Sequence, residues 1–225
     1  MTSIKQNNLY TVKIRWYPFF VTRKSTYHHG DLRRALVDAA AELAAERGPE
    51  SVTLREAAKR AGVSHAAPYH HFVGRAELLH AVALEGFRRM DAEMRAAYRR
   101  NEKASPYDRL GALGKAYIRF AARNPHYFRA MFRGVTLDKA FPDPEEHGKR
   151  QFEGLVRAVQ ACLGEQGEPS KRALDHVLTA WAIVHGTASL WVERSFCDTP
   201  FEHAKIDDLS RRVVETSRRI FESKR

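Results

Sequence analysis

The sequence TLREAAKRAGVSHAAPYHHF, residues 53–72, decides the fold of this 225-residue chain. It opens with Thr53 and Glu56, whose spacing of three residues is the pattern of a capping box. In that pattern the threonine side chain accepts a hydrogen bond from the backbone at the start of a helix. Gly62 lies eight residues after Leu54 and is suited to end the helix with a left-handed backbone. A short helix is therefore predicted between Thr53 and Gly62.

A second short helix is predicted directly after it, capped by Ser64 and ending near Phe72. Ala57 allows the two helices to approach closely, and Val63 fills the space between them. Pro68 lacks the N–H that would bond to the Ser64 carbonyl, so we expect this helix to be splayed at its start. The pair has the pattern of a DNA-binding helix-turn-helix, in which the second helix enters a major groove. A generic alanine-rich helical hairpin is the alternative.

Helical periodicity continues on both sides of this pair. Leu32, Leu36, Ala39 and Leu43 form one apolar stripe that ends at Arg47-Gly48, and a long helix is predicted from about Arg75. No stretch shows strand alternation, so the fold class is all-α. Between the prolines of the remaining sequence, further helices are predicted at about 106–123, 125–133, 146–164, 171–196 and 206–222.

Three regions follow from this pattern. Residues 1–26 are basic and aromatic without helical periodicity, and we interpret them as a flexible basic tail, with an arm along DNA as the alternative. Residues 27–74 contain the helix-turn-helix. We expect residues 75–225 to form a larger helical domain for effector binding and dimerisation.

The charge of the chain favours a polyanionic partner. The formal net charge is +11, and residues 1–75 hold 12 Lys/Arg against 6 Asp/Glu. Nucleic acid and an anionic membrane surface both fit this charge. No apolar run is long enough for a membrane span, and the first residues lack the apolar core of a signal peptide, so we expect a cytoplasmic protein without a membrane partner.

No pattern of catalysis or metal binding is evident, so we expect neither an enzyme nor a cofactor. The sequence contains no GxSxG, P-loop, GxGxxG or HExxH motif. Cys162 and Cys197 have no metal-ligand spacing, and we expect both to be reduced, with a disulfide as the minor alternative. His65, His70 and His71 include no pair four residues apart, so no metal site is predicted.

Residues 27–82 resemble the TetR/AcrR family of bacterial transcription regulators, because they combine a helix, GVS, a second helix and YHHF in that order. Trp181, His185 and Gly186 also resemble the signature of one C-terminal subgroup, known by these residues as WHG. The resemblance implies an N-terminal three-helix bundle with a helix-turn-helix, followed by a larger helical C-terminal domain. It implies that phosphates and bases are contacted by Thr53, Arg55, Ser64, His65, Ala66, Ala67, Tyr69, His70, His71 and Arg75.

These residues divide by chemistry. Thr53, Tyr69 and His71 can donate hydrogen bonds to phosphates, and Arg75 is expected to bind a phosphate with help from the dipole of its helix. Arg55 and His70 can reach either the backbone or a base. His65, Ala66 and Ala67 fall where bases are read, and the alanines can make only apolar contacts there.

The C-terminal region carries two further predictions. The segment 171–196 is apolar on two faces, so we expect a homodimer formed by 171–196 and 206–222, with burial against 106–164 alone as the alternative. His185 is interpreted as a hydrogen-bonded core histidine rather than a ligand. Candidate effector-binding residues are aromatic or lie in the apolar helix: Tyr117, Phe120, Phe128, Phe132, Trp181, His185 and Trp191.

The sequence thus predicts a regulator, with repression as its mode, that binds a palindromic operator as a homodimer and is released by an unknown small-molecule effector. The alternative is an architectural or interaction protein that binds DNA without an effector.

Overall fold

A computed structural model of the chain describes residues 29–132 and 144–222. Within these ranges the chain forms eight α-helices and two short 3-10 helices, and no strand. The expected all-α fold class is therefore confirmed. The predicted tail, residues 1–26, lies outside the described residues.

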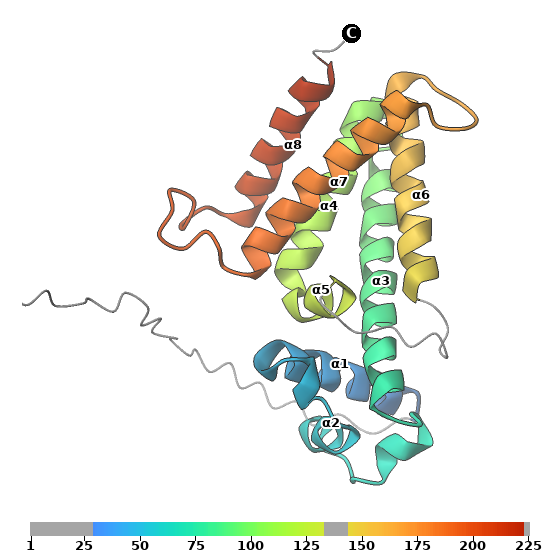
Figure 1. Ribbon diagram of the computed structural model, residues 1–225, viewed down its shortest axis with the longest axis vertical. Coiled ribbons are helices and arrows are strands. Elements are labelled where there is room, and N and C mark those ends of the chain that lie inside the picture. The colour runs from blue at the N-terminus through green and yellow to red at the C-terminus, as the bar shows by residue number, and fades with distance from the viewer. Residues whose placement is uncertain (1–28, 133–143, 223–225) are drawn as a thin grey trace, which may run out of the picture.

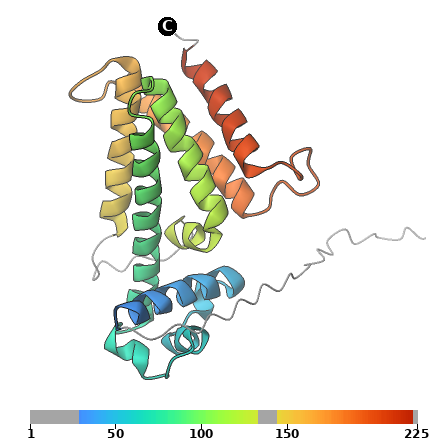
Figure 2. The same ribbon diagram turned by 180° about the vertical axis from the view of Figure 1, so that it is seen from behind.

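The N-terminal elements gather at one end of the molecule (Figure 1). They are α1 (His29–Arg47), the 3-10 helix η1 (Pro49–Ser51), α2 (Leu54–Ala61) and the 3-10 helix η2 (Ala67–His70). The long helix α3 (Arg75–Arg100) starts beside them and runs the length of the molecule, as both views show (Figures 1 and 2). A single rigid element thus joins the helix-turn-helix end to the opposite end.

The remaining helices pack around the distant half of α3. They are α4 (Pro106–Arg123), α5 (Pro125–Phe132), α6 (Pro144–Leu163), α7 (Lys171–Val192) and α8 (Ile206–Glu222). Proline is the first residue of α4, α5 and α6, a position that needs no N–H donor, which is why the prolines marked these boundaries in the sequence. The helix predicted at 171–196 ends earlier, at Val192, because Arg194 has a φ of 55° that no α-helix continues.

The second helix of the helix-turn-helix differs from its prediction. It is not an α-helix capped by Ser64, but the short 3-10 helix η2, whose cap position is Ala66 without a side-chain hydrogen bond. The amide of Ala67 bonds to the carbonyl of Ser64, and that of Tyr69 to Ala66, each three residues back. Pro68 supplies no N–H and is buried, so the α-helical bond at this position is missing and the tighter pattern replaces it.

One continuous hydrophobic core joins the helix-turn-helix to the helices packed around the middle of α3. It begins with Leu36 and Phe72 at the helix-turn-helix, passes along α3 and includes Phe120, Tyr127 and Val192. A separate, smaller core of Val159, Ala173 and Val177 lies between α6 and α7. A boundary near residue 75 was predicted from the sequence, and α3 does begin there. The core nevertheless has no gap at that point, so a shift of α3 or α5 would also move the packing of α1 and α2.

A polar network reinforces this junction. Asp38 of α1 accepts a hydrogen bond from the Tyr127 hydroxyl of α5 and an ion pair from Arg89 of α3 at 2.9 Å. The Arg89 guanidinium also lies over the Tyr127 ring, 4.4 Å from its centre. Burial and the neighbouring Asp38 carboxylate both raise the pKa of Tyr127, which keeps its hydroxyl protonated. Three helices that are far apart in sequence are therefore held together at one point.

Gly86 sets the spacing between α3 and α5. A Cβ atom placed on it would lie 2.7 Å from the sulfur of Met131 and 3.4 Å from the Cβ of Tyr127. The absence of a side chain lets α5 approach α3 closely enough for Tyr127 to meet Arg89 and Asp38.

Candidate DNA-binding surface and ligand cavity

The helix-turn-helix is held rigid by local bonds. The Thr53 hydroxyl accepts a hydrogen bond from the backbone N–H of Glu56 at 3.1 Å, as the capping pattern predicted. Gly62 ends α2 with a φ of 70°, in the left-handed region that glycine adopts without strain. Arg60 makes two bonds to Glu46 of α1, at 2.5 and 2.6 Å, and the bond to Arg60 holds the pKa of the Glu46 carboxyl below its ordinary value. The position of α2 on α1 is therefore fixed.

Most of the residues predicted to contact DNA share the exposed surface of α2, η2 and the start of α3. Tyr69 is 64% exposed although it is large and aromatic. An aromatic ring this exposed on a short rigid element is available to a partner. The other exposed members are Thr53, Arg55, Ser64, His65, Ala66, His70 and Arg75.

Two of the predicted DNA contacts are half-buried instead. Ala67 packs against the hydrophobic core and His71 is partly covered. Ala67 lies on the inner side of η2, so its side chain faces the protein, whereas the side chain of Ala66 is exposed. Sequence reasoning missed Val73, which is 89% exposed beside the same surface. Its neighbour Phe72 is almost fully buried. Two adjacent apolar residues are too few to show from the sequence which of them is exposed.

Arg75 makes contacts that its sequence position does not suggest. Its Nε donates to the carbonyl of Val52 at 2.9 Å and its Nη2 donates to the carbonyl of Pro49 at 2.8 Å. The side chain therefore joins the start of α3 to the segment between α1 and α2. A guanidinium has five N–H donors, so Nη1 and one N–H of Nη2 are left over by these two bonds. The predicted phosphate contact can use those donors.

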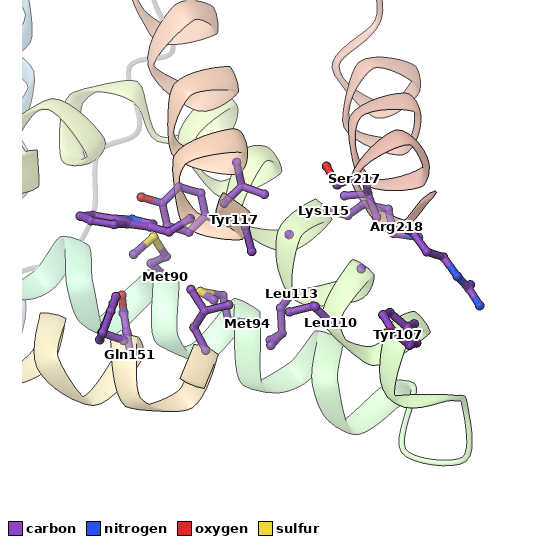
Figure 3. Close-up of a pocket in the computed structure, with 18 of the residues that line it drawn as sticks. Met90, Met94, Tyr107, Leu110, Leu113, Lys115, Tyr117, Gln151, Ser217 and Arg218 are labelled. Atoms are coloured by element: carbon purple, nitrogen blue, oxygen red, sulfur yellow. The ribbon is translucent and has the colours of Figure 1, made fainter. Parts of the chain in front are cut away.

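The opposite half of the molecule contains a cavity of about 730 Å³ between α3, α4, α6, α7 and α8. This volume lies within the range of small-molecule sites. In Figure 3 Met90, Tyr117 and Gln151 lie toward one side of the view, and Lys115, Ser217 and Arg218 toward the other. The wall is mainly apolar and aromatic, with contributions from Phe87, Met90, Met94, Phe132, Phe152 and Trp181.

Three of the seven predicted effector-binding residues line this cavity: Tyr117, Phe132 and Trp181. The other four do not. Phe120 and Phe128 are buried in the core, and His185 and Trp191 are outside the lining. Sequence reasoning missed the α3 side of the cavity, which Phe87, Met90 and Met94 form. Their spacing is that of any buried helix face, and nothing in it separates a cavity wall from a filled core.

His185 lies directly behind the cavity wall. Its Nδ1 is 2.8 Å from the hydroxyl of Tyr117, and its ring contacts Phe128, Phe132 and Trp181. Burial lowers the pKa of His185 and raises that of Tyr117, so both groups stay neutral near pH 7. This hydrogen-bonded, partly buried histidine matches its interpretation from the sequence.

The two apolar faces of α7 have different environments. Ala173, Val177 and Ala188 are buried against the rest of the protein. On the other side, Leu178 is 60% exposed, and Leu174 and Leu190 are also exposed. Within the described residues, burial of α7 against 106–164 therefore covers one face only.

Other sites in the described part of the chain are few. The thiols of Cys162 and Cys197 are both free, the first buried and the second exposed. No group of three His, Cys, Asp or Glu side chains there is arranged to hold a metal ion. No described helix is long and apolar enough to cross a membrane.

Comparison with known proteins follows the same division into two parts. Residues 36–82 match the family described as bacterial regulatory proteins of the tetR family. Residues 110–217 match the tetracyclin repressor-like C-terminal domain. Together the two matches span most of the chain. The first covers the helix-turn-helix, and the second covers much of the half that contains the cavity.

Individual relatives and solved structures are consistent with these two family matches. A curated relative is an uncharacterized HTH-type transcriptional regulator, YobS of Bacillus subtilis, which is 26% identical over 74% of this chain and 82% of its own length. A protein of unknown function from Rhodococcus sp. RHA1 has a similar structure, with a TM-score of 0.67 and 32% identity over 87% of this chain and 98% of that one. AibR, solved with isovaleryl coenzyme A and operator DNA, shares the fold, with a TM-score of 0.62 and 19% identity over 84% and 97%.

The helix-turn-helix, the all-helical C-terminal half and both family matches lead to one assignment. This chain belongs to the TetR family of bacterial transcription regulators and binds DNA through its helix-turn-helix.

Proposed function

We propose that this regulator is a homodimeric repressor that binds a palindromic operator and is released by a small-molecule effector. The observation that carries the proposal is the arrangement of two candidate sites on one rigid helix. The exposed surface around η2 lies at one end of α3, and the cavity borders the other end through Phe87, Met90 and Met94. A ligand that favours one position of α3 therefore changes the position of the helix-turn-helix.

The junction between these sites supports coupling. Asp38, Arg89 and Tyr127 join α1, α3 and α5, and Phe87 of α3 packs edge-on against Phe132 at the end of α5. Phe132 lines the cavity. A ligand that displaces Phe132 would thus act on the helix that holds α1.

Dimerisation is supported by the exposed apolar face of α7. Leu174, Leu178 and Leu190 would be left in water in a single subunit, and a two-fold contact between copies would bury them. A dimer presents two copies of η2, and half-sites about 34–36 Å apart fit such a pair. We place the contact on α7 and α8, within 171–196 and 206–222.

Residue roles in DNA binding remain as proposed from the sequence, with one change of emphasis. His65, Ala66 and His70 are exposed and suited to base contacts, whereas Ala67 is half-buried. Thr53, Tyr69, His71 and Arg75 are proposed to contact phosphates.

Trp181, His185 and Gly186 support membership of the WHG subgroup. We propose that the protein acts in the cytoplasm, without catalytic activity or a cofactor.

The relatives add support. AibR has the same fold and was solved with a coenzyme A thioester and operator DNA together. The alternative, a DNA-binding architectural protein without an effector, is favoured by no observation, because the cavity of about 730 Å³ would then have no role.

The test is fluorescence anisotropy with labelled DNA from the region upstream of the gene, repeated in the presence of a panel of metabolites. We expect saturable binding of two subunits per palindrome and a loss of affinity with at least one compound. Binding to a single asymmetric half-site would contradict the dimer model. Affinity that stays constant across the panel, together with no binding of any compound to the free protein, would favour the architectural alternative.

A further inference from the structure

Two ion pairs join α4 and α8, the helices on one side of the cavity. Arg119 of α4 pairs with Asp207 of α8 at 2.6 Å. Asp108 of α4 pairs with Arg218 of α8 at 2.7 Å, and Asp108 also accepts a hydrogen bond from Ser105. The two helices are antiparallel, so these pairs lie at successive levels along the contact.

Lys115 lies between these two levels and lines the cavity. Its side chain is half-buried, and among the described residues no carboxylate pairs with it. On the facing helix α8, Ser210 is buried and Val214 lies close to Gly111 and Gly114. Glu215 also borders the cavity, but it is exposed and lies 3.8 Å from Arg211. Lys149 also lines the cavity, but its side chain is exposed. Lys115 is thus the half-buried cation of this wall that forms no ion pair with the described chain.

The polar groups on the rest of the cavity wall are mostly bonded within the protein. The Gln151 amide nitrogen donates to the carbonyl of Phe87 at 2.8 Å, and the Tyr117 hydroxyl is bonded to His185. Apolar and aromatic side chains cover most of the remainder, including Met90, Phe152 and Trp181. The wall therefore favours an apolar body and offers one half-buried cationic group to a ligand, with the exposed Lys149 at its edge.

We propose that the cavity binds a small amphipathic molecule with a single anionic head group, and that Lys115 is its counter-ion. The Lys115 ammonium group can donate charge-assisted hydrogen bonds, and a carboxylate at hydrogen-bond distance would accept them more strongly than a neutral hydroxyl. The apolar body of the ligand then covers the methionine and aromatic side chains of the wall. This inference rests on the proposed effector role of the cavity and adds the chemical class of the effector.

Three probes with one alkyl chain test the charge: decanoate, decanol and decylamine, each titrated calorimetrically into the full-length protein below its micellar concentration. We expect decanoate to bind with one site per subunit and about tenfold more tightly than decanol, with decylamine weakest. In the Lys115→Met variant, decanoate should lose about that tenfold advantage while decanol binding is retained. Lys115→Arg, which keeps the charge, should restore the preference for decanoate.

The matched control is Lys171→Met, which removes an exposed lysine that does not line the cavity. It should leave all three affinities unchanged. The inference is overturned if decylamine or decanol binds as well as decanoate, if none of the three binds, or if Lys115→Met keeps the full preference. Retention of decanol binding by Lys115→Met shows that the variant still folds around its cavity.

DNA titrations separate this inference from the proposed function. If decanoate binds as expected and operator affinity stays constant, the anion site stands and the release of DNA by that site is contradicted. If a neutral or cationic compound occupies the cavity and releases DNA, the regulator proposal stands and the anion site is overturned.

Discussion

Arg75 is expected to have two roles, one inside the protein and one toward DNA, and substitutions can separate them. Its Nε and Nη2 bond to the carbonyls of Val52 and Pro49, while its remaining donors are free for a phosphate at the N-terminus of α3. Arg75→Ala removes both roles. Arg75→Lys keeps the positive charge but loses the planar fork that reaches two carbonyls at once.

The magnitudes follow from these contacts. A buried hydrogen bond from a charged donor contributes about 1.5–3 kcal/mol, and the exposure of Arg75 reduces this to roughly 0.5–1 kcal/mol for each of its two bonds. Arg75→Ala should therefore lower the free energy of unfolding by about 1–2 kcal/mol. A dimer that loses one phosphate contact in each subunit should also lose about 1.8 from the slope of log K against log salt concentration.

Two assays measure these effects on the same variants: urea denaturation followed by circular dichroism, and anisotropy titrations with operator and random DNA at several salt concentrations. In Arg75→Lys, most of the stability that the Arg75 side chain contributes should be lost, while most of the magnitude of the salt slope should be retained. Arg95→Ala is the matched control, because Arg95 lies on the same helix, is exposed and pairs only with Asp91 in the described contacts. It should change neither quantity by a comparable amount.

One result would refute the reasoning about phosphate. If Arg75→Ala weakens operator binding while the salt slope stays constant, Arg75 acts on DNA only by holding η1 and α3 together. A change in the preferred operator sequence would show instead that Arg75 reads bases, and our placement of the recognition element would be wrong.

The remaining predictions concern assembly, stability, pH and thiol chemistry. Leu178→Arg should convert a dimer into a folded monomer in sedimentation experiments, because Leu178 is exposed within the subunit; a native protein that is already monomeric at micromolar concentration contradicts the interface. Tyr127→Phe should lower the free energy of unfolding by about 1–2 kcal/mol through loss of the bond to Asp38, whereas Tyr107→Phe, which loses no described hydrogen bond, should not. Burial lowers the pKa of His185 below its ordinary 6.5, so the unfolded chain binds a proton at this group at a higher pH than the folded protein does. Stability should therefore fall as pH drops below about 6.5, and His185→Asn should reduce that fall; an unchanged slope would exclude His185 as its source. Burial raises the pKa of Cys162 to about 11, so Ellman's reagent at pH 8 should label the exposed Cys197 in the native protein and Cys162 only after denaturation; equal rates in the native state would contradict the described burial.

Sequence alone determined the features that depend on neighbours along the chain. The Thr53 cap, the left-handed Gly62 and the prolines that open α4, α5 and α6 are local, because each involves backbone groups within one helical turn. They set the helix boundaries to within a few residues and identified the helix-turn-helix. Most of the residues that the motif singled out for DNA contact are exposed on one surface, since a surface on one short segment needs no distant information.

Tertiary structure decided everything that joins distant residues. Asp38 contacts Arg89 and Tyr127 across separations of 51 and 89 residues, and no periodicity in the sequence predicts such contacts. The same holds for the cavity, because Phe120 and Tyr117 lie on one helix with similar patterns, yet only Tyr117 faces the space between helices. Whether an apolar side chain fills a core, lines a cavity or remains exposed depends on how closely a second helix packs against it, and that distance is a property of the folded chain.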